Sequence, residues 1–247
     1  MQKGAKGYTA AMQKDEYPMR INKYLAHQKY CTRRAADELV EKRKVTINGR
    51  VAVLGDKVLE GDRVEVNFRP KKYTYYAYNK PRGIITHSAQ GNETEIKEMF
   101  PIDGVFPVGR LDKDSYGLII LTDDGRLTDA LLNPEHEHEK EYRVLCREKL
   151  PSYFQRRMEE GIDIEGYMTK PAKVQLLGDK KYSITLTEGK RHQIRRMCDK
   201  MGVAIAELER IRIMNVRLGS LKPGAHRAIE GPELIEFLDS VGLNRRN

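Results

Sequence analysis

The chain has 247 residues, a length that suits one large domain or two unequal ones. It is 39% hydrophobic, which is enough for a core, and its net charge of +9 favours an anionic partner such as nucleic acid over a membrane surface. Nearly all of the excess charge is local, because residues 1–72 hold 17 Lys and Arg against 9 Asp and Glu, whereas the remainder holds 28 against 27. We therefore expect a basic module joined to a near-neutral one.

The cysteines and the hydropathy of the chain indicate the cellular compartment to expect. Cys31, Cys146 and Cys198 lie far apart without Cys-x-x-Cys spacing, so reduced thiols are expected rather than a disulfide framework or a zinc site. The N-terminus has no apolar segment of the signal-peptide type, and no stretch approaches the roughly 18 apolar residues of a membrane span. We expect a soluble, cytoplasmic protein with no membrane partner.

The first third of the chain predicts a basic tail and a small folded unit. Residues 1–17 contain almost no bulky aliphatic side chains, so we expect them to be disordered. Thr32 is a suitable N-cap for a helix, and Asn48-Gly49 is a tight-turn signal between two strands. The elements expected within 18–68 are a helix over 20–29, a helix from 33 to about 43, a strand over 45–47, a return strand from 50, and a half-buried strand over 64–68.

Basic side chains gather around the second of these helices. They are Lys23, Arg33, Arg34, Lys42, Arg43 and Lys44. A solvated helix face is the usual explanation of such a cluster. However, Arg33 and Arg34 lie at a helix N-terminus, where cations oppose the helix dipole, so local stability does not explain them. Phosphate binding does.

This unit resembles the S4 RNA-binding domain. The resemblance is carried by residues 20–26, 31–37 and 45–49, followed by the turns at 55–56 and 61–62. It implies binding to structured RNA, with Arg33, Arg34 and their basic neighbours on the phosphates.

Residues 69–72 indicate a linker, and a second domain is expected over 73–247. Its first half is expected to hold strands over 75–78 and 84–86 around a turn at 79–83, a weak helix over 92–100, a buried strand over 118–121, a short helix over 127–132 and a strand over 140–144. A helix over 150–161 and a hairpin of 174–177 and 182–186 are expected next. The last elements are expected to be a basic helix over 192–201, strands near 203–209 and 211–218, and a helix over 232–239. Strands outnumber helices and do not alternate regularly with them. This favours an α+β fold with a mixed, mainly antiparallel sheet.

Asp112 is the first candidate for chemistry in this domain. It precedes an apolar run that predicts a buried strand, so it lies on a loop where a rigid scaffold can present it to a substrate. A lone Asp at such a place is usually a turn or cap residue. Its neighbours Arg110 and Lys113 supply positive potential, and Ser115 and Gly117 leave room for close approach.

Two further segments could join Asp112. Tyr142 lies in a predicted strand with charged flanks, although a strand tyrosine is usually packing. Arg191 and Arg195 are spaced i, i+4, so a helix would place both guanidinium groups on one face. If that face meets Asp112, an arginine would lower the pKa of the carboxyl and keep it ionised.

Other motifs carry less information. His136 and His138 suggest a metal site, but a single His-x-His with no further ligand cluster is more often surface. Residues 86–88 make a poor triad, and the chain has neither a P-loop nor a Gly-x-Gly-x-x-Gly motif. We expect no metal and no cofactor.

Together, the motifs resemble those of the pseudouridine synthases of the RsuA/RluB/RluE/RluF family. The matching segments are 109–118 with 121–125 for the central motif, 79–83 for the upstream motif, 140–142 for the tyrosine motif and 188–197 for the basic motif. The resemblance covers roughly residues 18–240. Residues 110–115, 138–142 and 208–216 look closest to the RluF branch, which acts on large-subunit (23S) ribosomal RNA. We expect a monomer, and the resemblance leaves open whether transfer RNA is also a substrate.

The resemblance implies isomerisation of a flipped uridine, without a cofactor. Asp112 would be the essential carboxylate, which either attacks C1′ or removes the 2′ proton. Arg195 would pair with it, and Tyr142 would stack on the base and assist removal of the C5 proton. The residues implied to contact the substrate are Arg110, Arg191, Gln193 and Ile194.

Two rivals remain from other classes. One is an S4-type ribosome assembly or rescue factor that binds RNA without catalysis, which would explain the basic module but not the combination of Asp112, Tyr142 and Arg195. The other is an RNA N-glycosidase, in which water captures C1′. Isomerisation leaves the mass of the RNA unchanged, whereas base loss does not.

Overall fold

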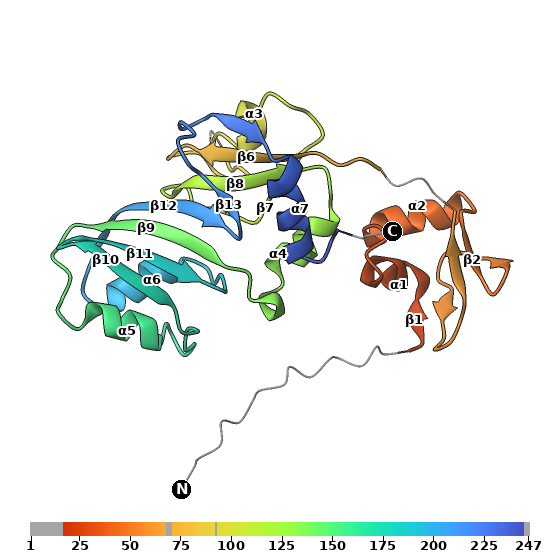
Figure 1. Ribbon diagram of the computed structural model, residues 1–247, viewed down its shortest axis with the longest axis horizontal. Helices are drawn as coiled ribbons and strands as arrows, with labels where there is room; N and C mark the ends of the chain where they lie inside the picture. Colours follow the sequence, from red (N-terminus) through yellow and green to blue (C-terminus); the bar gives the residue numbers. More distant parts are fainter. Residues whose placement is uncertain (1–16, 68–70, 92, 245–247) are drawn as a thin grey trace, which may run out of the picture. The chain divides into compact units, whose positions relative to one another are not determined.

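The computed structural model describes residues 17–67, 71–91 and 93–244 (Figure 1). The chain divides into two compact units, residues 1–70 and 71–247. Residues 1–16 of the expected tail, Phe68 of the expected strand and residues 69–70 of the expected linker lie outside the described residues. Among the residues described, no helix combines the length and apolar character that a membrane crossing requires.

The N-terminal unit consists of a two-residue strand, two helices and then four further short strands. These elements are β1 (Met19–Arg20), α1 (Ile21–His27), α2 (Arg33–Glu41), β2 (Val45–Ile47), β3 (Arg50–Val51), β4 (Lys57–Val58) and β5 (Val64–Val66). The Thr32 hydroxyl accepts a hydrogen bond from the Ala35 amide at 3.2 Å, so the predicted N-cap of α2 is confirmed. Leu25 and Ala36 are fully buried in the core of this unit. The helix, helix, sheet order predicted from the sequence is confirmed.

The strands of this unit form two small sheets. β2 pairs antiparallel with β3 and with β5, and β1 pairs antiparallel with β4. The β1–β4 pair was not predicted, because two-residue strands are too short to show an alternation of polar and apolar residues. α2 ends two residues before the predicted boundary, and Arg43 then adopts the left-handed conformation with φ of 55°.

The second unit is built on a nine-stranded sheet within its described residues. The strand order is β10-β11-β9-β12-β8-β6-β14, with β7 beside β8 and β13 beside β12. The strands are β6 (Tyr75–Lys80), β7 (Phe106–Val108), β8 (Tyr116–Thr122), β9 (Lys140–Cys146), β10 (Lys173–Gly178), β11 (Lys181–Leu186), β12 (Ile205–Ile213), β13 (Val216–Arg217) and β14 (His226–Ala228). The β8–β12 pair is parallel and the other pairs are antiparallel, which confirms the mixed, mainly antiparallel sheet.

The helices of this unit pack on three separate cores. They are α3 (Ile96–Met99), α4 (Arg126–Leu132), the 3₁₀ turn η1 (Pro134–His136), α5 (Phe154–Glu160), α6 (Gln193–Lys200) and α7 (Gly231–Ser240). Ile96 of α3 packs in a small core with Tyr78 and Ile119. Leu127 of α4 and Phe237 of α7 pack in the core around β6 and β8. Phe154 of α5 and Met197 of α6 pack in the core under β9 and β11, and Figure 1 shows both helices beside that part of the sheet.

β12 is the strand that joins these two halves. It lies between β8 and β9, with Leu208 in the core of the β9 half and Ile213 in the core of the β8 half. The sequence predicted a break near position 210, and this prediction is wrong. Arg210 is 4% exposed in the middle of one continuous strand.

Two further expectations are corrected in this unit. Residues 84–86 are not a strand, since Ile85 forms only an isolated bridge with Glu95. The Thr86 hydroxyl instead bonds the backbone of Leu111, accepting from its amide at 3.0 Å and donating to its carbonyl at 2.9 Å. The turn predicted over 79–83 begins later, because β6 continues through Lys80.

Candidate active site

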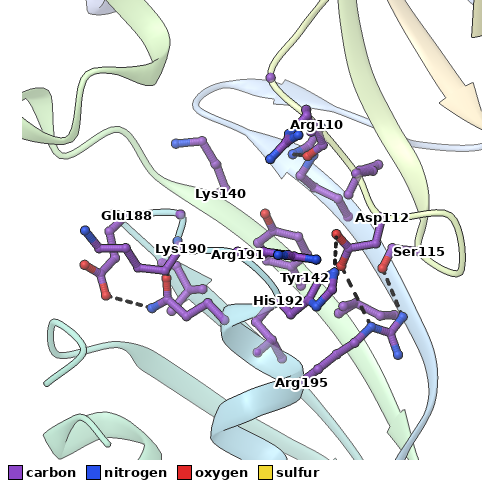
Figure 2. A pocket seen from close by; sticks show the side chains of 18 of the residues that line it. Arg110, Asp112, Ser115, Lys140, Tyr142, Glu188, Lys190, Arg191, His192 and Arg195 are labelled. Carbon is purple, nitrogen blue, oxygen red and sulfur yellow. Dashed lines mark hydrogen bonds and ion pairs between the residues drawn. The ribbon is translucent and has the colours of Figure 1, made fainter. Parts of the chain in front are cut away.

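A pocket of about 360 Å³ opens where five segments of the second unit meet (Figure 2). The segments are the loop after β7, the end of α4 with Asn133, the start of β9, the stretch from the end of β11 to the first turn of α6, and the middle of β12. The residues predicted from the sequence that line it are Arg110, Asp112, Tyr142, Arg191, Gln193, Ile194 and Arg195. The structure therefore brings together every site residue predicted in this domain.

Asp112 lies on the loop between β7 and β8, where its side chain is 37% exposed. Its Oδ2 is 3.9 Å from Nε of Arg195, and its Oδ1 is 3.5 Å from Nε2 of His192. Nη2 of Arg195 also donates to the Ser115 hydroxyl at 3.1 Å (Figure 2). The carboxylate thus stands between two basic side chains, with part of its surface open to a ligand.

Lys80 supports this loop from inside the protein and was not recognised from the sequence. Its side chain is fully buried, and Nζ donates to the carbonyl of Ser115 at 2.8 Å and to that of Pro81 at 3.0 Å. Burial lowers the pKa of Lys80 to about 8, while the negative charge of Asp112 acts in the opposite direction. The interpretation of position 80 as a turn residue hid this contact.

Arg191 and Arg195 do not share a helical face, so this expectation is corrected. Arg191 lies in a turn, and His192 adopts the left-handed conformation with φ of 52° before α6 begins at Gln193. Both arginines line the pocket, but the ion pair with Asp112 is formed by Arg195.

The loop before α6 is organised around Glu188, which is 3% exposed. Its carboxylate accepts hydrogen bonds from the Tyr167 hydroxyl at 2.5 Å, the Lys170 amide at 3.0 Å and Nε2 of Gln193 at 2.7 Å. Oε1 of Gln193 accepts from the Lys190 amide at 2.9 Å. The amide of Gln193 is therefore engaged within the loop itself, and it fixes the backbone from which the basic side chains project.

Tyr142 and Ile194 belong to the apolar part of the pocket, which also includes leucine side chains such as Leu208. Ile194 is 5% exposed, and both residues belong to the core under β9 and β11. Lys140, two residues before Tyr142, donates to the His138 carbonyl at 3.2 Å. Burial, aided by the positive charge of Arg210, lowers the pKa of Lys140 to about 8. Figure 2 shows Lys140 and Arg110 on the side of the pocket away from Arg195.

The basic residues predicted in the N-terminal unit are all exposed. Lys23 lies on α1, Arg33 and Arg34 form the start of α2, and positions 42–44 follow its end. The first turn of α2 contains no acidic residue, and Lys42 forms an i, i+4 pair with Glu38 at 3.8 Å. This exposed set comprises Lys23, Arg33, Arg34, Lys42, Arg43 and Lys44, and it is called the α2 basic surface below.

Of the two histidines considered for a metal site, His138 has a structural role. His138 is buried, and its Nε2 lies 2.8 Å from the Ala130 carbonyl oxygen. In residues 17–67, 71–91 and 93–244, no group of three or more His, Cys, Asp or Glu side chains is arranged to hold a metal ion.

Comparison with known proteins identifies the two units. Residues 74–200 match the RNA pseudouridylate synthase family, and residues 19–64 match the S4 domain. The chain is 41% identical to the dual-specificity RNA pseudouridine synthase RluF of Salmonella typhi, over 90% of this chain and 79% of the relative. It is 34% identical to the ribosomal large subunit pseudouridine synthase B of Bacillus subtilis, over 92% of this chain and 98% of the relative.

A solved structure agrees with these matches. The crystal structure of a pseudouridylate synthase superposes with a TM-score of 0.66 at 28% identity, covering 90% of this chain and 99% of the other. The resemblance found in the sequence motifs is thereby confirmed. The chain belongs to the RNA pseudouridylate synthase family and carries an S4 domain before its synthase domain.

Proposed function

We propose that this RNA pseudouridine synthase modifies a uridine of 23S ribosomal RNA, using the Asp112 carboxylate. The observation that carries the proposal is the meeting of Asp112, Arg195 and Tyr142 in one pocket. The relative named for the ribosomal large subunit supports this choice of RNA, since the two chains match over nearly their whole lengths.

The reaction breaks the N1–C1′ bond, turns the uracil over and joins C5 to C1′. The N1–C1′ bond is exchanged for a C5–C1′ bond, and the C5 proton leaves while N1 gains one, so no external donor or redox partner enters. Asp112 acts in its ionised form, either by attacking C1′ or by removing the 2′ proton. Arg195, with Nε 3.9 Å from the carboxylate, is its positively charged neighbour in the pocket.

The uridine reaches Asp112 only after it leaves the RNA stack, at a cost of a few kcal/mol. The aromatic ring of Tyr142 offers a stacking surface for the extruded base, and the Ile194 side chain offers an apolar contact for the same base. We assign Arg110 to the space that the base vacates, and Arg191 to the neighbouring phosphates. Gln193 contributes by fixing the loop that carries Arg191.

The α2 basic surface supplies a separate part of the affinity. Cations on phosphates release counterions and make binding depend on salt, and structured RNA is recognised largely by its shape and exposed loops. The S4 domain thus holds the RNA, and the pocket of the synthase domain carries out the reaction.

Pseudouridine mapping in cells with and without this gene tests the substrate. We expect one 23S position to lose its pseudouridine in the deletion strain and to regain it when the wild-type gene is restored. An unchanged 23S map would contradict the proposal. Transfer RNA is mapped in the same samples, because relatives of this chain are named dual-specificity enzymes.

Mass analysis of RNA treated with the purified protein tests the reaction. Isomerisation leaves the mass unchanged and creates a new C-glycoside, whereas hydrolysis of the glycosidic bond would leave an abasic site of lower mass. Binding without either change would support the non-catalytic alternative.

We also infer that the protein acts as a monomer, because the five segments that line the pocket all come from one chain. Sedimentation at the concentration of the activity assay checks this inference, and a stable dimer would contradict it.

A further inference from the structure

Arg210 occupies the position where the two halves of the synthase sheet meet. It pairs with Gly117 in the parallel contact of β12 with β8, and with Tyr142 in the antiparallel contact of β12 with β9. β8 follows the Asp112 loop, and β9 carries Tyr142. Arg210 therefore stands between the two groups to which the proposed reaction gives the main roles.

The side chain of Arg210 reaches both flanks of the Asp112 loop. It is 4% exposed and lines the pocket. Its Nε donates to the Leu118 carbonyl at 2.7 Å, after the loop, and its Nη1 makes a longer contact of 3.5 Å with the Arg110 carbonyl, before Asp112. Hydrogen bonds from a charged donor are stronger than neutral ones, so one planar group ties both flanks of the loop to β12.

Stability alone does not explain this arginine. Among the described residues, no carboxylate forms an ion pair with Arg210, and its Nη2 is buried without a hydrogen-bond partner. Burying a cation without a counter-ion costs free energy, as does an unpaired N–H group. Arg212, two residues further along β12, differs because its guanidinium contacts Glu139 at 3.0 Å and Glu141 at 2.7 Å.

We propose that Arg210 is a positioning residue that sets the Asp112 loop against the strand of Tyr142, so that carboxylate and ring address the same nucleotide. The inference rests on the roles proposed for Asp112 and Tyr142. It requires the fork of the guanidinium, because two different nitrogens, Nε and Nη1, contact the Leu118 and Arg110 carbonyls, whereas a lysine ends in a single nitrogen. A misplacement of about 1 Å at a reacting group can cost about 100-fold in rate.

The test compares Arg210→Met, Arg210→Lys and Arg212→Met in single-turnover assays at saturating RNA. We expect Arg210→Met to lower the rate about 100-fold while the Kd for RNA stays within about threefold of wild type. Arg210→Lys should recover only part of the rate, because it restores the charge but not the fork. Arg212→Met is the matched control, and it should keep the rate within about twofold although it loses two ion pairs and therefore stability.

Several results would overturn the inference. One is a folded Arg210→Met protein whose rate stays near that of wild type, and another is full recovery by Arg210→Lys. A parallel loss of rate in Arg210→Met and Arg212→Met would reduce the role to stability. If Arg210→Met does not fold, Arg210→Lys decides, because a partial rate with unchanged RNA affinity supports positioning and a full rate refutes it.

Asp112→Asn separates this inference from the proposed function. Retained activity in Asp112→Asn would remove the proposed function itself, whatever Arg210→Met does. An inactive Asp112→Asn protein together with an active Arg210→Met protein would overturn only the positioning role.

Discussion

Gly117 and Arg210 approach each other so closely that no side chain fits between their backbones. A Cβ built on Gly117 would lie 2.4 Å from the carbonyl oxygen and 2.8 Å from the amide nitrogen of Arg210. Gly117 also has φ of +103°, a conformation that residues with a side chain rarely adopt. Gly117 and Arg210 are paired in the parallel contact of β8 with β12, which joins the two halves of the sheet.

Gly117→Ala should therefore destabilise the synthase domain. We expect the free energy of unfolding to fall by about 2–4 kcal/mol, because the backbone must move or accept strain at a paired strand. Urea unfolding measures the change. Gly189→Ala is the control for stability, since its Cβ meets nothing within 4 Å and its φ is not in the left-handed region. Equal effects of the two substitutions would contradict the steric explanation.

Asp112→Asn should abolish isomerisation and leave RNA binding nearly intact. The amide keeps the shape of the side chain but can neither attack C1′ nor accept the 2′ proton. Tritium release from RNA labelled at C5 measures the reaction, and filter binding measures the affinity. Asp114→Asn is the matched control, because Asp114 is exposed on the same loop and does not line the pocket. Tritium release by Asp112→Asn would refute the role.

Replacing Arg33 and Arg34 by Ala together should weaken RNA binding without slowing the reaction of bound RNA. Each lost phosphate contact should lower the steepness of log K against log salt by about 0.7–0.9, so two contacts lower it by up to about 1.8. Titrations at several salt concentrations give this slope. Arg156 and Arg157, an exposed arginine pair on α5, provide the control double variant. An unchanged slope in Arg33→Ala/Arg34→Ala would count against phosphate contacts at α2.

Lys140→Met should change how stability depends on pH. The pKa of Lys140 is lowered from 10.5 to about 8, so between these values the unfolded chain binds more protons than the folded chain. The free energy of unfolding contributed by this group therefore rises as pH increases through that window. We expect wild type to gain stability relative to Lys140→Met between pH 8 and 10.5, in chemical unfolding at several pH values.

The control for this measurement is Lys97→Met, which removes one positive charge from an exposed position. Each variant is compared with wild type at every pH, so that groups common to both proteins cancel. A difference between wild type and Lys140→Met that stays constant across the window would show that the folded protein does not lower the pKa of Lys140.

Local patterns predicted the parts of the site that depend on neighbouring residues. The apolar run after Asp112 is β8, so the placement of the carboxylate on the loop before a buried strand is confirmed. Thr32 is the N-cap of α2 as predicted, and Gly161 ends α5 with φ of 96°. These features follow from the spacing of a few residues, and such spacing is visible in the sequence.

Features that depend on distant segments could not be predicted in the same way. The sequence predicted two strands, near 203–209 and 211–218, whereas Arg210 lies within one continuous strand. The carbonyls that receive its hydrogen bonds belong to residues about 90 to 100 positions earlier, so the spacing of neighbouring residues could not reveal this contact. The expected face shared by Arg191 and Arg195 failed for a local reason: His192 takes a left-handed conformation, so the helix begins after Arg191. The role of Lys80 could not be predicted either, because its ammonium group bonds the carbonyl of Ser115, which lies 35 positions later in the chain.

The late position of β12 in the chain has a consequence for biosynthesis. This strand comes after residue 204, yet it fills the space between β8 and β9, which are complete by residue 146. Until it emerges from the translating ribosome, β8 and β9 each present an unpaired edge, the kind of surface that invites wrong pairing between chains. A nascent chain that ends before β12 would hold Asp112 and Tyr142 but could not bring them together. We therefore expect release of a nearly full-length polypeptide to precede enzymatic competence.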